Sequence, residues 1–183
     1  MSVIQFRSTK EFVHMLAMFK QAGTWMLPQW TKKNALTADE YLDVRDRWEQ
    51  NDMVVLDFDG LLHPTRKLAR MMHNIKNARS VMKFEGSKRT QYYLLGPVDI
   101  LYIENDGDFW FMTLCDASGC KRFVAETLKK ETEGLLVTMT LDEEGNPIEK
   151  TWKLEDCEER ETILHEHMDL FYERKWLKQK VSS

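Results

Sequence analysis

The sequence contains little cysteine: Cys115, Cys120 and Cys157 are the only three among 183 residues. An odd number without Cys-x-x-Cys spacing argues against a disulfide framework and indicates reduced thiols. The chain also lacks a long hydrophobic run, since no segment approaches the ~20 apolar residues that span a bilayer. Its first residues lack the apolar core of a signal peptide. We therefore expect a soluble, cytoplasmic protein that does not insert into a membrane.

Basic residues are not in excess, because the formal net charge is −4. Nucleic-acid binding depends mainly on neutralising phosphates, so the composition argues against a nucleic-acid partner. The segment 66–89 does hold eight Lys or Arg and one acid. It lacks aromatic side chains placed for base stacking. We interpret it as a solvated face or a protein-binding face.

The composition is that of a folded domain. Hydrophobic residues make up 43% of the chain, enough to bury a sizeable core. The sequence shows no repeat, low-complexity tract or linker that would divide it. We predict a single domain over residues 1–183, with a mainly helical part at 1–90 and a β-hairpin and helix part at 91–183.

Helix signals dominate the first half. Ser8-x-x-Glu11 and Thr37-x-x-Glu40 have the spacing of capping boxes, and each predicts a helix that starts at the next residue. The short apolar segment 53–58 is compatible with a strand. A third, amphipathic helix is predicted from Pro64, a residue suited to a first helical turn, to about Met82.

Hairpin signals dominate the second half. β-rich segments at 98–104 and 109–114 flank a turn that contains Gly107, and segments at 135–141 and 148–154 flank a turn that contains Gly145. Such turns are typical of antiparallel hairpins.

Two further helices are expected, one from Ser118 and a long last helix opened by Asp156-x-x-Glu159. The predicted fold class is α+β. An antiparallel β-sheet built from hairpins would be packed with helices, with an N-terminal helical segment and a long C-terminal helix.

The segment Asp57-Phe58-Asp59-Gly60 has two interpretations. It resembles the nucleophile motif of dehalogenase-type phosphatases, with Asp57 as nucleophile and Asp59 as acid/base. That chemistry needs a hydroxyl ligand, a lysine, Mg²⁺ and a parallel sheet. Leu61 replaces the expected Thr, and the predicted hairpins are antiparallel. We therefore favour a turn that leads into the helix at Pro64 and keep the phosphatase as a lesser alternative.

Other catalytic and metal-binding patterns are weak. His165 and His167 are two residues apart, and on a helix such side chains point to different faces. The sequence has no supported Ser/His/Asp arrangement and no Gly-rich phosphate loop. We predict no catalytic residue, metal or cofactor, and therefore not an enzyme.

The order of motifs over residues 8–114 carries a family resemblance. An opening helix is followed by a Leu-Pro connector, a Thr-x-x-Glu helix that contains a Trp, an Asp-Gly-Leu turn, an x-Pro step, a Leu-Ala helix, and strands that end in an Asp-Gly hairpin. These features are Leu27-Pro28, Thr37, Glu40, Trp48, Asp59-Gly60-Leu61, His63-Pro64 and Leu68-Ala69. The pattern resembles the EspG-like chaperones of type VII (ESX-type) secretion.

The resemblance implies a cytoplasmic, non-enzymatic chaperone, a shorter Gram-positive relative of the mycobacterial members. It would bind the hydrophobic helical end of a secreted substrate protein before export. An immunity or regulatory protein-binding domain would have the same composition and stays open as an alternative. A homodimer is also left open.

Eleven Met and six Trp suit the binding of a hydrophobic partner segment. We expect the partner on the strand at 109–114, with Trp110 as the anchor, and then on Trp152 and the last helix. The candidate partner-binding residues are Phe109, Trp110, Met112, Trp152, Phe171 and Trp176. Each of these aromatic side chains has the alternative of an ordinary core position, because aromatics dominate protein cores.

Overall fold

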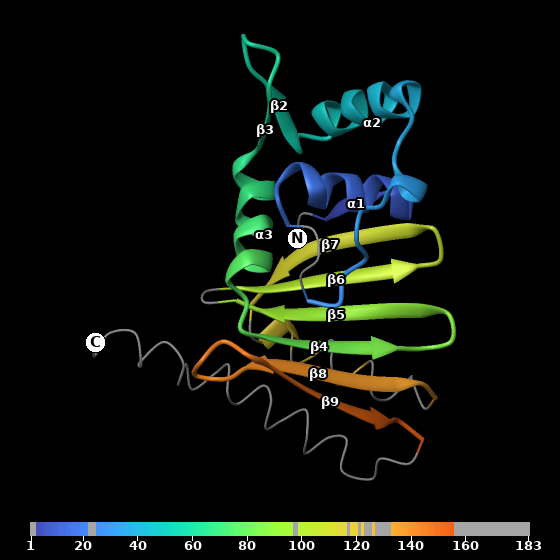
Figure 1. Cartoon of the computed structure of the whole chain (residues 1–183), viewed down its shortest axis with the longest axis vertical. Helices are drawn as coiled ribbons and strands as arrows, with labels where there is room; N and C mark the ends of the chain where they lie inside the picture. The colour runs from blue at the N-terminus through green and yellow to red at the C-terminus, as the bar shows by residue number, and fades with distance from the viewer. Residues whose placement is uncertain are drawn as a thin grey trace, which may run out of the picture.

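The computed structural model describes residues 3–21, 25–96, 99–116, 118–120, 122, 126 and 133–155. These residues form a seven-stranded antiparallel sheet, a separate two-stranded hairpin and helices packed on the sheet (Figure 1). The predicted α+β class with a large antiparallel sheet is confirmed. The predicted long C-terminal helix, which includes Phe171 and Trp176, lies outside the described residues.

The large sheet draws its strands from both halves of the chain. Its order is β1 (Ile4–Phe6), β7 (Phe109–Cys115), β6 (Ile100–Asp106), β5 (Arg89–Leu95), β4 (Ser80–Glu85), β8 (Leu135–Leu141) and β9 (Pro147–Lys153). Both predicted hairpins are present: β6 pairs with β7 across Gly107-Asp108, and β8 pairs with β9. Strands β1 and β4 were not predicted, because β1 has only three residues and β4 continues the apolar pattern of the preceding helix.

The helix starts follow the capping signals. Helix α1 (Thr9–Met18) begins after Ser8, whose Oγ accepts the Glu11 N–H at 3.1 Å. Helix α2 (Ala38–Gln50) begins with a complete capping box between Thr37 and Glu40. A 3₁₀ turn, η1 (Lys32–Asn34), precedes it. Both predicted helix starts are confirmed.

The third helix is shorter than predicted. Helix α3 spans Arg66–Asn77, whereas Pro64 ends strand β3 (Leu62–Pro64) and Met82 lies in β4. Proline suits an edge strand as well as a first helical turn, since neither requires its missing N–H. The prediction of one helix from Pro64 to about Met82 was therefore wrong at both ends.

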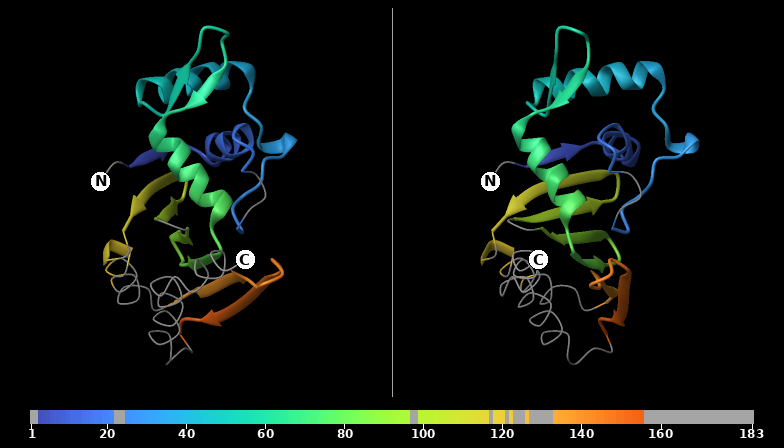
Figure 2. Two further views of the ribbon diagram at one scale, coloured as in Figure 1. Left: turned by 90° about the vertical axis from the view of Figure 1, so that its left-hand side faces the viewer. Right: turned by 60° about the vertical axis from the view of Figure 1, so that its left-hand side comes forward.

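Apolar side chains cover both faces of the sheet. On one face α3 crosses the strands (Figure 2) and α1 packs near β1 and β7, and Phe12, Leu68 and Ile75 join a core with Leu94 and Ile103. On the other face Met82, Phe84, Tyr93 and Leu95 are buried with Cys120 and Leu154. Every residue of β5 from Gln91 to Leu95 is buried, as expected for a central strand.

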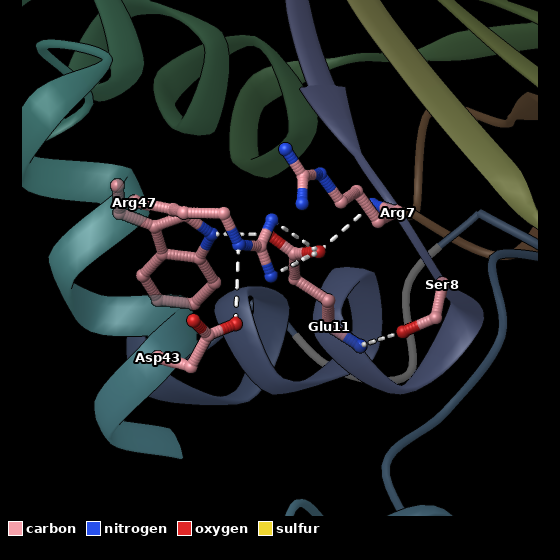
Figure 3. A network of polar contacts seen from close by, with 6 residues as sticks. Arg7, Ser8, Glu11, Asp43 and Arg47 are labelled. Atoms are coloured by element: carbon pink, nitrogen blue, oxygen red, sulfur yellow. Dashed lines mark hydrogen bonds and ion pairs between the residues drawn. The ribbon is translucent and has the colours of Figure 1, made fainter. Parts of the chain in front are cut away.

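A buried carboxylate connects α1, α2 and β1 (Figure 3). Glu11 is only 1% exposed, and it accepts hydrogen bonds from the Arg7 N–H at 2.8 Å and the Trp48 Nε1–H at 2.8 Å. The Arg47 guanidinium binds the same carboxylate at 3.2–3.3 Å and also contacts Asp43 at 3.4 Å. Burying a charge is costly unless it is paired and hydrogen-bonded, and here both conditions are met.

We predict that Glu11→Ala lowers the free energy of unfolding by about 3–5 kcal/mol, because it leaves Arg47 as a poorly compensated cation and the Trp48 N–H without an acceptor. Urea denaturation measures the change. The matched control is Glu49→Ala on the exposed side of α2, which should stay within about 0.5 kcal/mol of the wild type. Equal effects of the two substitutions would contradict the role given to Glu11.

Candidate partner-binding hairpin

Strands β2 (Val54–Leu56) and β3 (Leu62–Pro64) form a hairpin outside the main sheet. They pair antiparallel from Val54 opposite Pro64 to Leu56 opposite Leu62, which leaves residues 57–61 as the loop. The hairpin follows directly from the end of α2 and extends beyond that helix, away from the sheet (Figures 1 and 2).

Asp57 holds the five-residue loop. Its Oδ1 accepts the N–H groups of Asp59 at 2.9 Å and Leu61 at 2.8 Å, and its Oδ2 lies 2.7 Å from His63 Nε2. The His63 hydrogen bond is the largest cause that lowers the pKa of Asp57, followed by the Leu61 N–H. Gly60 has a φ of 76°, a left-handed conformation that glycine adopts without strain.

The loop between β8 and β9 repeats this geometry. Asp142 Oδ1 accepts the N–H groups of Glu144 and Asn146 at 2.9 and 2.7 Å, in the places of Asp59 and Leu61. Gly145, like Gly60, has a positive φ and donates its N–H to the carbonyl of the first loop residue. The two loops therefore share one backbone design, with an aspartate first and a glycine fourth.

The recurrence of this loop conformation explains Asp57 as a residue that orders a hairpin loop, without requiring a role as a catalytic nucleophile. Both of its carboxylate oxygens bind groups of its own hairpin, and β2 belongs to an antiparallel pair. Among the described residues, no group of three or more His, Cys, Asp or Glu side chains is placed to hold a metal ion. The turn does not lead directly into a helix, however, because β3 and Thr65 come before α3.

Exposed apolar side chains are concentrated on this hairpin. Phe58 at the tip is fully exposed, and Val55, Leu56 and Leu61 are 39–60% exposed. Single exposed apolar residues are common on protein surfaces, whereas a cluster on a projecting element is typical of an interaction site.

Acidic side chains are frequent in the hairpin loop and on the helix that precedes the hairpin. Asp59 lies in its loop, and the neighbouring helix α2 exposes five acids: Asp39, Glu40, Asp43, Asp46 and Glu49. Some are paired, such as Glu40 with Lys10 and Asp46 with Arg45. The exposed side of α2 and the hairpin loop therefore carry several acidic side chains.

The candidates taken from the sequence occupy different environments. Trp110 is 5% exposed, stacks on Phe12 at 4.2 Å and donates its Nε1–H to Thr9 Oγ1 at 3.0 Å. Met112 is fully buried. The structure thus places Trp110 in the core, which was the alternative stated for the aromatic candidates, and Met112 lies there too, because this side of β7 faces the helices. Phe109 is exposed beside the β6–β7 turn, and Trp152 is half-buried against the second core.

The basic segment 66–89 does not form a continuous basic face. Arg70 binds Asp99 at 2.6 and 2.7 Å, Lys83 pairs with Glu85, and Arg89 lies 3.8 Å from Glu104. These residues come from α3, β4 and β5, and their acidic partners reduce the local charge.

The β2–β3 surface was missed from the sequence, although one signal was present. The Asp-x-x-Gly spacing at residues 57–60 recurs at 142–145, within one of the two predicted hairpin turns. The segment 53–58 is expected as a possible strand, and β2 lies within it, but its partner strand at residues 62–64 is not predicted from the sequence.

Comparison with models of known protein families and with curated proteins finds no match to this chain. Within the described residues, no helix combines the length and the hydrophobicity required to cross a membrane. Function therefore has to be inferred from the geometry of the hairpin and its surroundings.

We predict that His63→Ala raises the pKa of Asp57 toward the ordinary value of 3.8, because it removes the largest cause of the lowered pKa. The ionised carboxylate orders the loop, so this order is present above pH 3.8 and is lost as the pH falls through the lowered pKa. Carboxyl ¹³C NMR titration measures the shift.

Asp142 is the internal control for this titration, because Asn146 and not a histidine is the main cause of its lowered pKa. Its titration should be the same in both proteins. An unchanged Asp57 titration in His63→Ala would contradict the described loop.

Proposed function

We propose that this chain is a non-enzymatic protein-binding domain that holds an apolar segment of a partner through the β2–β3 hairpin. The observation that carries the proposal is Phe58, a fully exposed aromatic side chain at the tip of an ordered loop. Val55, Leu56 and Leu61 extend the apolar surface around it.

The energetics favour such a role. Burying a side chain the size of Phe or Leu contributes ~1.5–3 kcal/mol, so several of them on one hairpin can supply most of a specific contact. The Asp57 hydrogen bonds fix the loop before binding, and a pre-ordered loop loses less conformational entropy when it docks.

The acids of the loop and of α2 favour one partner chemistry. Asp59 and the exposed acids of α2 would repel an anionic surface and attract lysine or arginine at the rim of an apolar patch. We therefore propose a partner segment with an apolar face bordered by basic residues, such as an amphipathic helix.

Within this class we propose a cytoplasmic chaperone that covers the hydrophobic helical end of a secreted substrate before export. This is the role implied by the resemblance to EspG-like chaperones of type VII secretion. The exposed apolar hairpin supports it, since such a surface can shield an aggregation-prone segment of another protein.

We predict that Phe58→Asp weakens partner binding and leaves stability unchanged, because the side chain has no packing within the chain to lose. The tagged protein is purified from its native cells, the co-purified partner is identified by mass spectrometry, and binding is repeated with the purified partner by calorimetry. Loss of a central apolar anchor should weaken binding at least about tenfold.

The matched control is Ile148→Asp, which introduces the same charge at an exposed apolar position on β9. It should bind the partner like the wild type. A partner that is a helical export substrate supports the chaperone, whereas inhibition of a toxin partner would replace it with the immunity role. Equal binding by Phe58→Asp and the wild type would refute the hairpin as the binding site.

A further inference from the structure

A second candidate site contains no residue of the β2–β3 hairpin. It is a groove of about 290 Å³ between β1 and the C-terminal end of α2. Gln5 and Arg7 line it on the β1 side, and Arg47, Asn51 and Met53 line it on the other. Ligand pockets start near this volume, so the groove suits a short segment of a ligand and not a large molecule.

The open edge of β1 borders the groove. In the described part of the chain β1 pairs only with β7. The two-residue turn at Gly107-Asp108 makes Asp106 and Phe109 a hydrogen-bonded pair. Along β7, hydrogen-bonded and non-hydrogen-bonded residues alternate, so the backbone N–H and C=O groups of Trp110 and Met112 point away from β6 and toward β1. They bond Phe6 and Ile4, which leaves the Gln5 N–H and C=O on the open side.

Contacts on either side of Gln5 agree with this alternation. The Arg7 N–H donates to Glu11 at 2.8 Å, and the Val3 carbonyl accepts from Lys67 Nζ at 3.4 Å, both away from β7. The Val3 carbonyl and the Arg7 N–H are thus satisfied within the chain. Gln5 is left with one N–H and one C=O that another extended chain can bond.

The charge at this edge is positive. Two guanidinium groups line the groove and no acid does. Arg47 is neutralised by Glu11 and Asp43, whereas the Arg7 side chain makes no ion pair or hydrogen bond with any residue that the structure describes. Arg7 is therefore the uncompensated cation of the groove.

We propose that this groove binds an extended, acidic segment of a partner protein by strand addition to β1. The segment would form two main-chain hydrogen bonds with Gln5 and place a carboxylate on the Arg7 guanidinium. This site is separate from the β2–β3 hairpin and does not depend on the function proposed for it.

Two other occupants fit less well. A second copy paired through its own β1 would bring no acid to Arg7, because residues 3–7 contain none. A free inorganic anion would be attracted by Arg7 but repelled by the Gln5 carbonyl, which needs a donor. An acidic peptide satisfies the N–H, the C=O and the cation together.

The test uses an end-capped seven-residue probe, Thr-Val-Thr-Asp-Thr-Val-Thr, and the same peptide with Asn in place of Asp. Each is titrated to about 5 mM into ¹⁵N-labelled full-length protein while the amide signals of Gln5 and Arg7 are followed by NMR. The Asp peptide should shift both signals and bind about tenfold more tightly than the Asn peptide, as expected for one charge-assisted contact.

Arg7→Gln should remove this difference without loss of stability, because its backbone N–H still donates to Glu11. Phe58→Asp should leave peptide binding unchanged. The proposal is overturned if neither peptide shifts Gln5, if both bind equally, or if Arg7→Gln has no effect. It is also overturned if phosphate alone reproduces the shifts, or if sedimentation shows a dimer that excludes the peptide.

Discussion

The placement of the helices depends on one buried carboxylate. Glu11 binds the backbone at the end of β1, the indole of Trp48 and the guanidinium of Arg47, so it connects the first strand and the first two helices. Because β2 begins four residues after the end of α2, the same contacts also set the direction in which the β2–β3 hairpin leaves the body of the protein. The β1 groove, lined by Arg7, Arg47 and Met53, lies among the residues that these contacts connect.

The two Asp-x-x-Gly loops have the same backbone conformation but different side chains at their tips. They share the aspartate that accepts two loop N–H groups and the glycine with positive φ, yet one tip carries Phe58 and Leu61 and the other carries Glu143 and Asn146. A loop that needs only its first and fourth residues leaves the others free to vary. The fold therefore does not require apolar residues at the tip of the β2–β3 hairpin. Their presence there favours a role in binding a partner.

Local signals predicted much of the fold. The starts of α1 and α2 and the β6–β7 and β8–β9 hairpins follow from capping and turn residues that are adjacent in sequence. The errors concern strands held by long-range contacts: β1 is too short for a periodic pattern and pairs with the distant β7, and Met82 fits a continued helix until β4 pairs with β8. The binding surface was harder still, since Val55 and Leu56 look like core residues and only their position on a projecting hairpin shows that they are exposed.

The pairing of β1 with β7 has a consequence for the order of assembly on the ribosome. Ile4 lies opposite Met112, about a hundred residues later in the chain, so the first strand emerges long before its neighbour exists. Contacts among the first fifty residues can form early, whereas this distant pairing has a high loop-closure cost and comes late. Until β7 is synthesised, Ile4 and Phe6 have no strand to pair with, and the nascent chain is then most open to aggregation and to help from general folding factors.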